Sequence, residues 1–142
     1  CIGASVLGGV CNNSGGALVR RGPAYTELAL YARVNDDGQL ELVNHLGVNL
    51  GETPEEILSK LETKNYQIGD IINNSGCCAS DHRYGHDVKQ VDENTPARFN
   101  ADPSRLYEAS GSAGKVCVFA VWIPLKKFQA KYSTWVQIHM MI

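Results

Sequence analysis

The pattern of apolar and polar positions predicts a β-hairpin in the first half of the chain. Residues 26–34 form an apolar-rich run, and residues 39–46 alternate between polar and apolar side chains. Between them lies the polar turn Asn35-Asp36-Asp37-Gly38. Two strand-like runs joined by a short loop that contains glycine are typical of a hairpin.

Apolar residues spaced three or four positions apart predict a short helix that begins after Thr53. Thr53 suits the N-cap, Pro54 suits the first helical position, and Glu56 completes a capping box. The apolar stripe that follows consists of Ile57, Leu58 and Leu61. A second short helix is predicted over residues 102–107, where an aspartate and a proline repeat this start.

The remaining pattern predicts one more strand and a long polar excursion. Residues 66–72 indicate a weak strand or a connector, and residues 73–94 are polar and irregular, as expected of a surface segment. Residues 116–121 form a continuous run of apolar, largely β-branched side chains. Such a run is typical of a strand that is buried on both faces.

Composition places the chain among ordinary globular domains. Its 142 residues, 44% hydrophobic and 20% charged, suffice for one domain with a core and exclude wholesale disorder. The formal net charge of −2 argues against a nucleic-acid-binding protein. The first residue is Cys1 rather than Met, so we expect a processed product or a fragment.

Cysteine usage and hydropathy indicate the cellular compartment. The five cysteines are Cys1, Cys11, Cys77, Cys78 and Cys117. Their odd number and irregular spacing favour reduced thiols in a cytosolic setting. No signal peptide is visible at the N-terminus, and the longest apolar run is far shorter than a membrane-spanning helix requires.

A glycine-dense segment over residues 8–16 is the strongest candidate for chemistry. Glycines leave backbone N–H groups unshielded, and consecutive N–H groups in a turn form a nest that suits a diphosphate. The hydroxyls of Ser5 and Ser14 add donors without adding bulk. The alternative interpretation is a structural turn between two strands.

Three other candidates are weaker. Gly111-Ser112-Ala113-Gly114-Lys115 is similar to a phosphate-binding loop, but Ala109 and Val116 occupy the places of the required glycine and hydroxyl residue, which leaves a glycine-rich turn before a strand. His45 is interpreted as a packed or surface histidine. The possible metal ligands are Cys77, Cys78, His82 and His86. Their glycine-containing flanks do not favour a helix, so a solvated polar loop without metal is the preferred interpretation.

The N-terminal cysteine supports a different class of function as the alternative. In an N-terminal nucleophile hydrolase, Cys1 would be the nucleophile and its own α-amine the base. No recognisable partner for an oxyanion accompanies it, and truncation explains the same residue more simply.

Several long motifs, in order, closely resemble the quinone-dependent (respiratory) D-lactate dehydrogenases of bacteria. The resemblance covers about residues 1–121, with one variable region near residues 64–92. The motifs are the segments 1–16, 21–27, 43–47, 51–55, 95–103 and 110–121. They include Cys-Ile-Gly-Ala-Ser at the start, Val-Asn-His-Leu-Gly from Val43 and Thr-Pro-Ala-Arg-Phe-Asn-Ala-Asp-Pro from Thr95.

The resemblance implies an α+β fold, part of an FAD-binding domain of the p-cresol methylhydroxylase type. It implies FAD contacts for Ser5, Gly15 and Val118. The reaction implied is the oxidation of D-lactate to pyruvate, with electrons passed to a membrane quinone, in a peripheral enzyme on the cytoplasmic side of the bacterial inner membrane. The family's other FAD loop and its large C-terminal part have no counterpart here. We therefore assign no catalytic base and expect this fragment to be inactive alone, although it remains a candidate flavin-binding module.

The last segment departs from the family. Residues 122–142 are unrelated to the stretch expected there, but a one-base shift of the reading frame permits a family-like sequence. We therefore predict a partial FAD-binding domain over residues 1–121 and an out-of-frame tail over residues 122–142. The apolar end of that tail would lack a partner for which it was selected.

Overall fold

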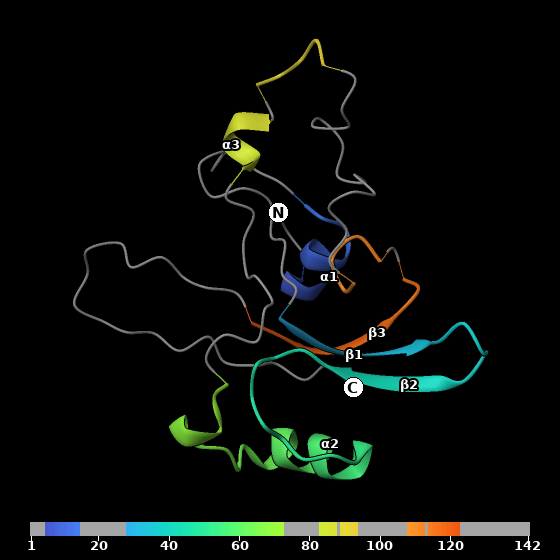
Figure 1. Ribbon diagram of the computed structural model, residues 1–142, viewed down its shortest axis with the longest axis vertical. Coiled ribbons are helices and arrows are strands. Elements are labelled where there is room, and N and C mark those ends of the chain that lie inside the picture. The colour runs from blue at the N-terminus through green and yellow to red at the C-terminus, as the bar shows by residue number, and fades with distance from the viewer. Residues whose placement is uncertain are drawn as a thin grey trace.

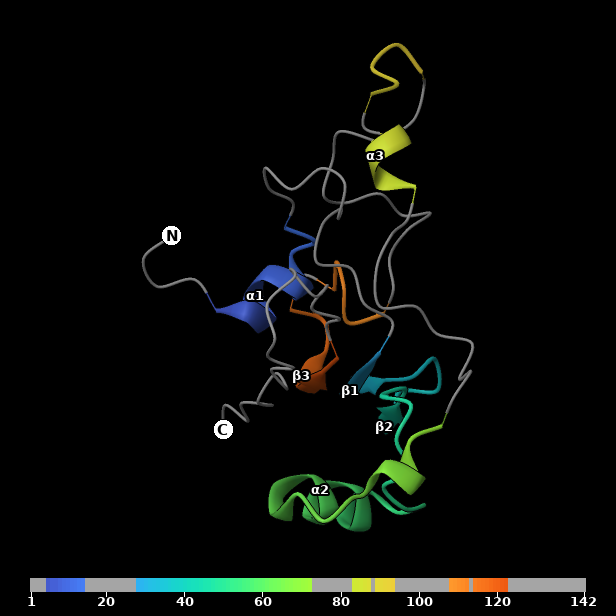
Figure 2. The same ribbon diagram turned by 90° about the vertical axis from the view of Figure 1, so that its left-hand side faces the viewer.

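A small antiparallel sheet lies at the centre of the protein. The computed structural model describes residues 5–14, 28–72, 83–87, 89–93, 108–112 and 114–122. Its sheet has three strands in the order β2-β1-β3, with β1 over Ala29–Val34, β2 over Leu40–Asn44 and β3 over Cys117–Val121. Figures 1 and 2 show helix α1 (Val6–Cys11) on one side of this sheet and helix α2 (Pro54–Thr63) on the other. This arrangement is compatible with the predicted α+β class.

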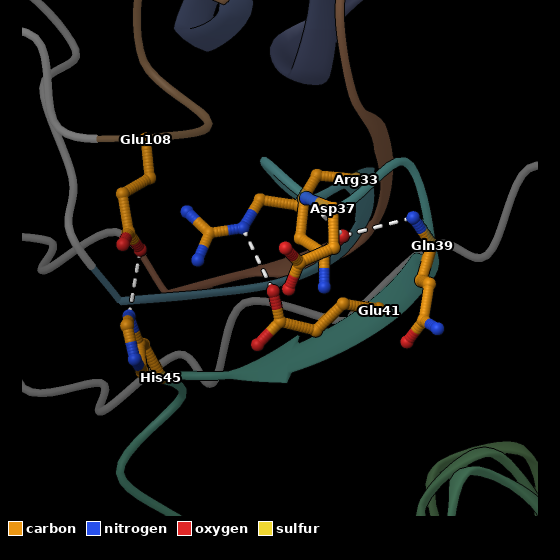
Figure 3. A network of polar contacts seen from close by, with 7 residues as sticks. Arg33, Asp37, Gln39, Glu41, His45 and Glu108 are labelled. Atoms are coloured by element: carbon orange, nitrogen blue, oxygen red, sulfur yellow. Dashed lines mark hydrogen bonds and ion pairs between the residues drawn. The ribbon is translucent and has the colours of Figure 1, made fainter.

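The predicted hairpin is confirmed, with both strands shorter than predicted. The side-chain carbonyl of Asn35 accepts hydrogen bonds from the backbone N–H groups of Asp37 and Gln39 at 3.1 and 2.8 Å. Gly38 closes the turn with φ of 77°. Beyond the turn Arg33 pairs with Glu41 across the strands at 3.1 Å (Figure 3). β2 ends at Asn44 rather than residue 46, because the Asn44 side chain accepts the Leu46 N–H and turns the chain.

The prediction that the last strand is buried on both faces is wrong. β3 lies at an edge of the described sheet, where Cys117 is exposed and Ala120 is buried. The central strand β1 is the deeply buried one instead, with Ala29, Leu30 and Tyr31 at most 1% exposed. An unbroken apolar run therefore marked a strand correctly but did not distinguish a central position from an edge.

The two faces of the sheet carry separate apolar clusters. One cluster joins the sheet to α2 and consists of Leu30, Leu46, Val48, Leu50, Ile57, Leu61 and Ala120. The other cluster consists of Ala29, Tyr31, Val43 and Ala109, with Val116, Val118 and Val121 packed against it. Because β3 contains a bulge, its side chains do not alternate strictly between the two faces. Leu30 pairs with Ala120, but Tyr31 pairs with Val118. Phe119 is the extra residue between them.

Helix α2 follows its sequence signals closely. The Thr53 hydroxyl accepts the Glu56 N–H, and the Glu56 carboxylate accepts the Glu52 and Thr53 N–H groups. These backbone hydrogen bonds hold the pKa of Glu56 below its usual value. Ile57 and Leu61 are buried, and Lys64 ends the helix in the left-handed region with φ of 54°. The predicted capping box and apolar stripe are therefore confirmed.

The connecting segments are short and irregular. Residues 66–72 form a connector with the 3₁₀ helix η1 (Ile68–Asp70) and a single bridge between Val48 and Ile71. Within the predicted excursion, the described residues include the short helix α3 (Tyr84–Asp87), which stands away from the sheet in Figure 1. The helix predicted over residues 102–107 lies outside the described residues. Within the described ranges, no helix has the length and apolar character needed to cross a bilayer.

Candidate functional site

The described part of the glycine-dense segment is mainly a short helix. In α1 the Ser5 hydroxyl accepts the Gly8 N–H at 2.9 Å, and the Gly9 N–H donates to the Ser5 carbonyl at 3.0 Å. The prediction that Gly8 and Gly9 belong to a diphosphate nest is therefore wrong, since their N–H groups are used within the helix. The Ser5 hydroxyl still has a hydrogen to donate after it accepts this bond.

The end of α1 brings a polar side chain into the interior. Val10 is fully buried, and Asn13 follows the helix in the left-handed region with φ of 48°, a conformation that asparagine tolerates better than most residues. The Asn13 side chain is also fully buried, yet neither its oxygen nor its nitrogen has a hydrogen-bond partner. A buried amide without partners costs about 1–3 kcal/mol, so this position is suited to a polar partner from outside the described residues.

A second segment that contains a buried polar side chain without a hydrogen-bond partner precedes β3. The turn of residues 108–112 contains Ala109 and Ser110, both fully buried, and Ser112, whose buried hydroxyl oxygen has no hydrogen-bond partner. Figures 1 and 2 both show α1 beside the segment that leads from this turn to β3. Two neighbouring segments on one side of the sheet thus each hold a buried polar side chain without a partner.

The structure describes two of the three predicted site residues, Ser5 and Val118. Ser5 caps α1, on the side of the sheet away from α2. Val118 is half-buried and packs against the apolar cluster on the face that does not contact α2. The two residues therefore lie on the same side of the sheet. Gly15 lies outside the described residues, directly beyond Ser14.

One polar contact on this side of the sheet could not be predicted from the sequence. His45 Nδ1 lies 2.6 Å from Glu108 Oε2, although 63 residues separate them (Figure 3). The His45 ring also meets the Tyr31 ring edge-on, with centroids 6.4 Å apart and planes at 77°. Burial, and then the neighbouring Glu108 carboxylate, raise the pKa of Tyr31 above its usual value. The Tyr31 hydroxyl nevertheless has no hydrogen bond of good geometry.

The structure describes only some residues of the weaker candidate sites. Among the described residues, no group of three or more His, Cys, Asp or Glu side chains is placed to hold a metal ion. His86 contacts Asp87 at 3.1 Å, whereas Cys77, Cys78 and His82 lie outside the described ranges, as does Cys1. Cys11 and Cys117 are free thiols. Lys115 is exposed and lies between Gly114, which has a φ of 83°, and strand β3.

The chain is similar to three known proteins that share one name. No family model matches the chain. It is 64% identical over 135 residues to a quinone-dependent D-lactate dehydrogenase of Haemophilus influenzae, covering 93% of this chain and 24% of that protein. Proteins of the same name from Escherichia coli and Corynebacterium glutamicum are 61% and 49% identical over 121 and 120 residues, 85% and 84% of this chain and 21% of each relative. All three are named as dehydrogenases, which leaves the hydrolase alternative for Cys1 without support.

Proposed function

Since the chain belongs to the family of quinone-dependent D-lactate dehydrogenases and spans 21–24% of the length of the relatives it matches, we propose that it is an FAD-holding segment of such an enzyme. In the whole enzyme, D-lactate is oxidised to pyruvate and a membrane quinone is reduced. That enzyme associates peripherally with the cytoplasmic face of the bacterial inner membrane, where its quinone is dissolved.

One observation carries the proposal for this chain. Asn13 and Ser112 are buried without hydrogen-bond partners, on two segments that lie side by side next to the sheet. A cofactor with many polar atoms along its length would supply the missing partners. The donor set also suits it, because amide and hydroxyl groups can bind a diphosphate or a ring edge without adding charge. The residues present therefore fit FAD.

The roles of the residues follow from their positions. When bound, FAD supplies the hydride acceptor, a capacity that no side chain has. The Ser5 hydroxyl and the backbone around Gly15 would orient polar atoms of the cofactor. Val118 would present an apolar surface and exclude water, because it packs in the cluster on that face of the sheet. No residue of this chain is assigned as the catalytic base, and we expect the chain alone not to oxidise D-lactate.

Titration of the chain with FAD tests this proposal, with flavin absorbance and fluorescence as readouts. Ser5→Ala should weaken binding about tenfold, the effect expected for one hydroxyl hydrogen bond to a charged group. Thr53→Ala is the matched control, because it removes the N-cap of α2 on the opposite side of the sheet. Both changes remove a helix cap and should lower stability by a similar amount, about 1 kcal/mol.

The two variants separate binding from folding. If Ser5 contacts the cofactor, Thr53→Ala should retain flavin affinity within about twofold, a difference of only about 0.4 kcal/mol. An unperturbed flavin spectrum with the parent chain would exclude the proposal. Equal loss of affinity in the two variants would show that Ser5 acts only through helix stability.

A further inference from the structure

His45 is anchored to the sheet, and its ring contacts Glu108, whose backbone is strained. His45 directly follows β2, and its backbone N–H donates to the Ala29 carbonyl of β1 at 2.9 Å. Its ring is held against the Tyr31 ring, which is fully buried in the central strand. The imidazole is therefore anchored to the sheet by its own backbone and by its ring.

Glu108 begins a turn with a strained backbone. Its φ of 53° lies in the left-handed region, which is unfavourable for a residue with a long side chain. The turn then continues to Gly111 at φ of 75°. Within the described backbone, the turn is closed by a long bond of 3.4 Å from the Ser112 N–H to the Ala109 carbonyl. By contrast, Glu108 Oε2 lies only 2.6 Å from His45 Nδ1.

We propose that His45 is a positioning residue that acts through Glu108 to hold the turn of residues 108–112 in place beside α1. This role rests on the FAD-binding function proposed above, because the turn carries Ser112, one of the two buried polar side chains without a partner. His45 itself need not touch the cofactor. Without this tie, the strained Glu108 end of the turn opens more often although Ala109 stays packed in the apolar cluster, and Ser112 is held less firmly in place.

The amide exchange of the ligand-free chain tests the tie directly. In His45→Ala, the amide protons of Ser112 and Lys115, which bond within this segment, should exchange about tenfold faster, as expected for a local opening that becomes easier. His45→Asn should restore slow exchange, because the asparagine amide nitrogen occupies nearly the position of Nδ1 and can donate to Glu108. Glu41→Ala is the matched control, since it breaks the ion pair with Arg33 within the hairpin and leaves the turn untouched.

FAD titration of the same variants tests the positioning role. We expect His45→Ala to weaken FAD binding about fivefold, His45→Asn to recover most of the loss, and Glu41→Ala to bind as the parent does. Glu108→Ala provides a second route if His45→Ala does not fold. It removes the carboxylate and leaves a non-glycine residue in the left-handed region, so the turn should loosen and FAD binding should weaken.

The outcomes distinguish this inference from the proposed function. Unchanged amide exchange in His45→Ala would overturn the tie whatever FAD does. Faster exchange with unchanged FAD affinity would overturn the positioning role while the proposed function stands. A parent chain that does not bind FAD would overturn the proposed function and the positioning role with it, and the exchange data alone would still decide whether His45 holds the turn.

Discussion

Removal of the Tyr31 hydroxyl should make the chain less sensitive to alkali. Tyr31 is fully buried in β1, its hydroxyl has no hydrogen bond of good geometry, and burial together with Glu108 raises its pKa. A raised pKa means that the folded protein holds the phenolic proton more tightly than the unfolded chain does. This stabilisation is complete below the unfolded pKa near 10 and is lost as the pH rises from there through the folded value.

The size of the effect follows from proton linkage. While folded Tyr31 stays protonated, ionisation in the unfolded chain lowers the free energy of unfolding by RT ln(1 + 10^(pH − 10)), which is about 1.4 kcal/mol at pH 11 and almost nothing at pH 9. Tyr31→Phe cannot ionise and should lack this loss. At pH 8 the two proteins should differ by less than about 1 kcal/mol, since the hydroxyl that is removed had no good partner.

Urea unfolding followed by circular dichroism at pH 8, 9 and 11 measures this difference. Only the difference between the parent and Tyr31→Phe is informative, because the chain has six tyrosines and other groups also titrate. Tyr66→Phe, a change on the face of the sheet that contacts α2, controls for the loss of a tyrosine far from Glu108. Parallel pH dependence of the parent and Tyr31→Phe would refute the reasoning.

The remaining predictions concern packing, backbone conformation and the coding sequence. Leu30→Ala should lower the free energy of unfolding by about 2–5 kcal/mol, whereas Leu40→Ala, at a side chain 80% exposed, should change it by less than about 0.5 kcal/mol; urea titration of both checks the contrast. Gly51→Ala should lower the thermal midpoint, because φ is 116° and a Cβ would lie 2.8 Å from Glu56 Oε2; an unchanged midpoint contradicts this. The nucleotide sequence of codons 122–142 should yield a family-like sequence after a one-base shift, and a shifted frame without that sequence excludes the frameshift.

Local signals explain which parts of the fold the sequence predicted. The hairpin turn depends on Asn35 and Gly38, and α2 depends on Thr53, Pro54 and Glu56, all of which act within a few residues of one another. Such interactions survive in almost any tertiary context, so the elements were recognised without knowledge of the fold. Their boundaries were less secure, because the end of β2 depends on a side-chain bond by Asn44.

Tertiary contacts explain what the sequence did not predict. Two glycines in α1 argue against a helix, yet the segment is helical, with a cap by Ser5 and a buried Val10. The pairing of His45 with Glu108 joins positions 63 residues apart and leaves no local pattern. The edge position of β3 is also a property of the assembled sheet. For the candidate site, the sequence resemblance predicted Ser5 and Val118, while Asn13 and Ser112 emerged only from their burial without partners.

The bulge in β3 gives the sheet a tolerance to a change of length. Val118 and Val121 lie three positions apart and still pack on the same face, because Phe119 falls outside the pairing of Leu30 and Tyr31. Loss of Phe119 would bring Val118 and Ala120 into consecutive pairing without turning either side chain to the other face. We therefore expect removal of Phe119 to leave the composition of the Val118 and Val121 face unchanged, although it removes the contact that Phe119 makes with the cluster on the α2 face.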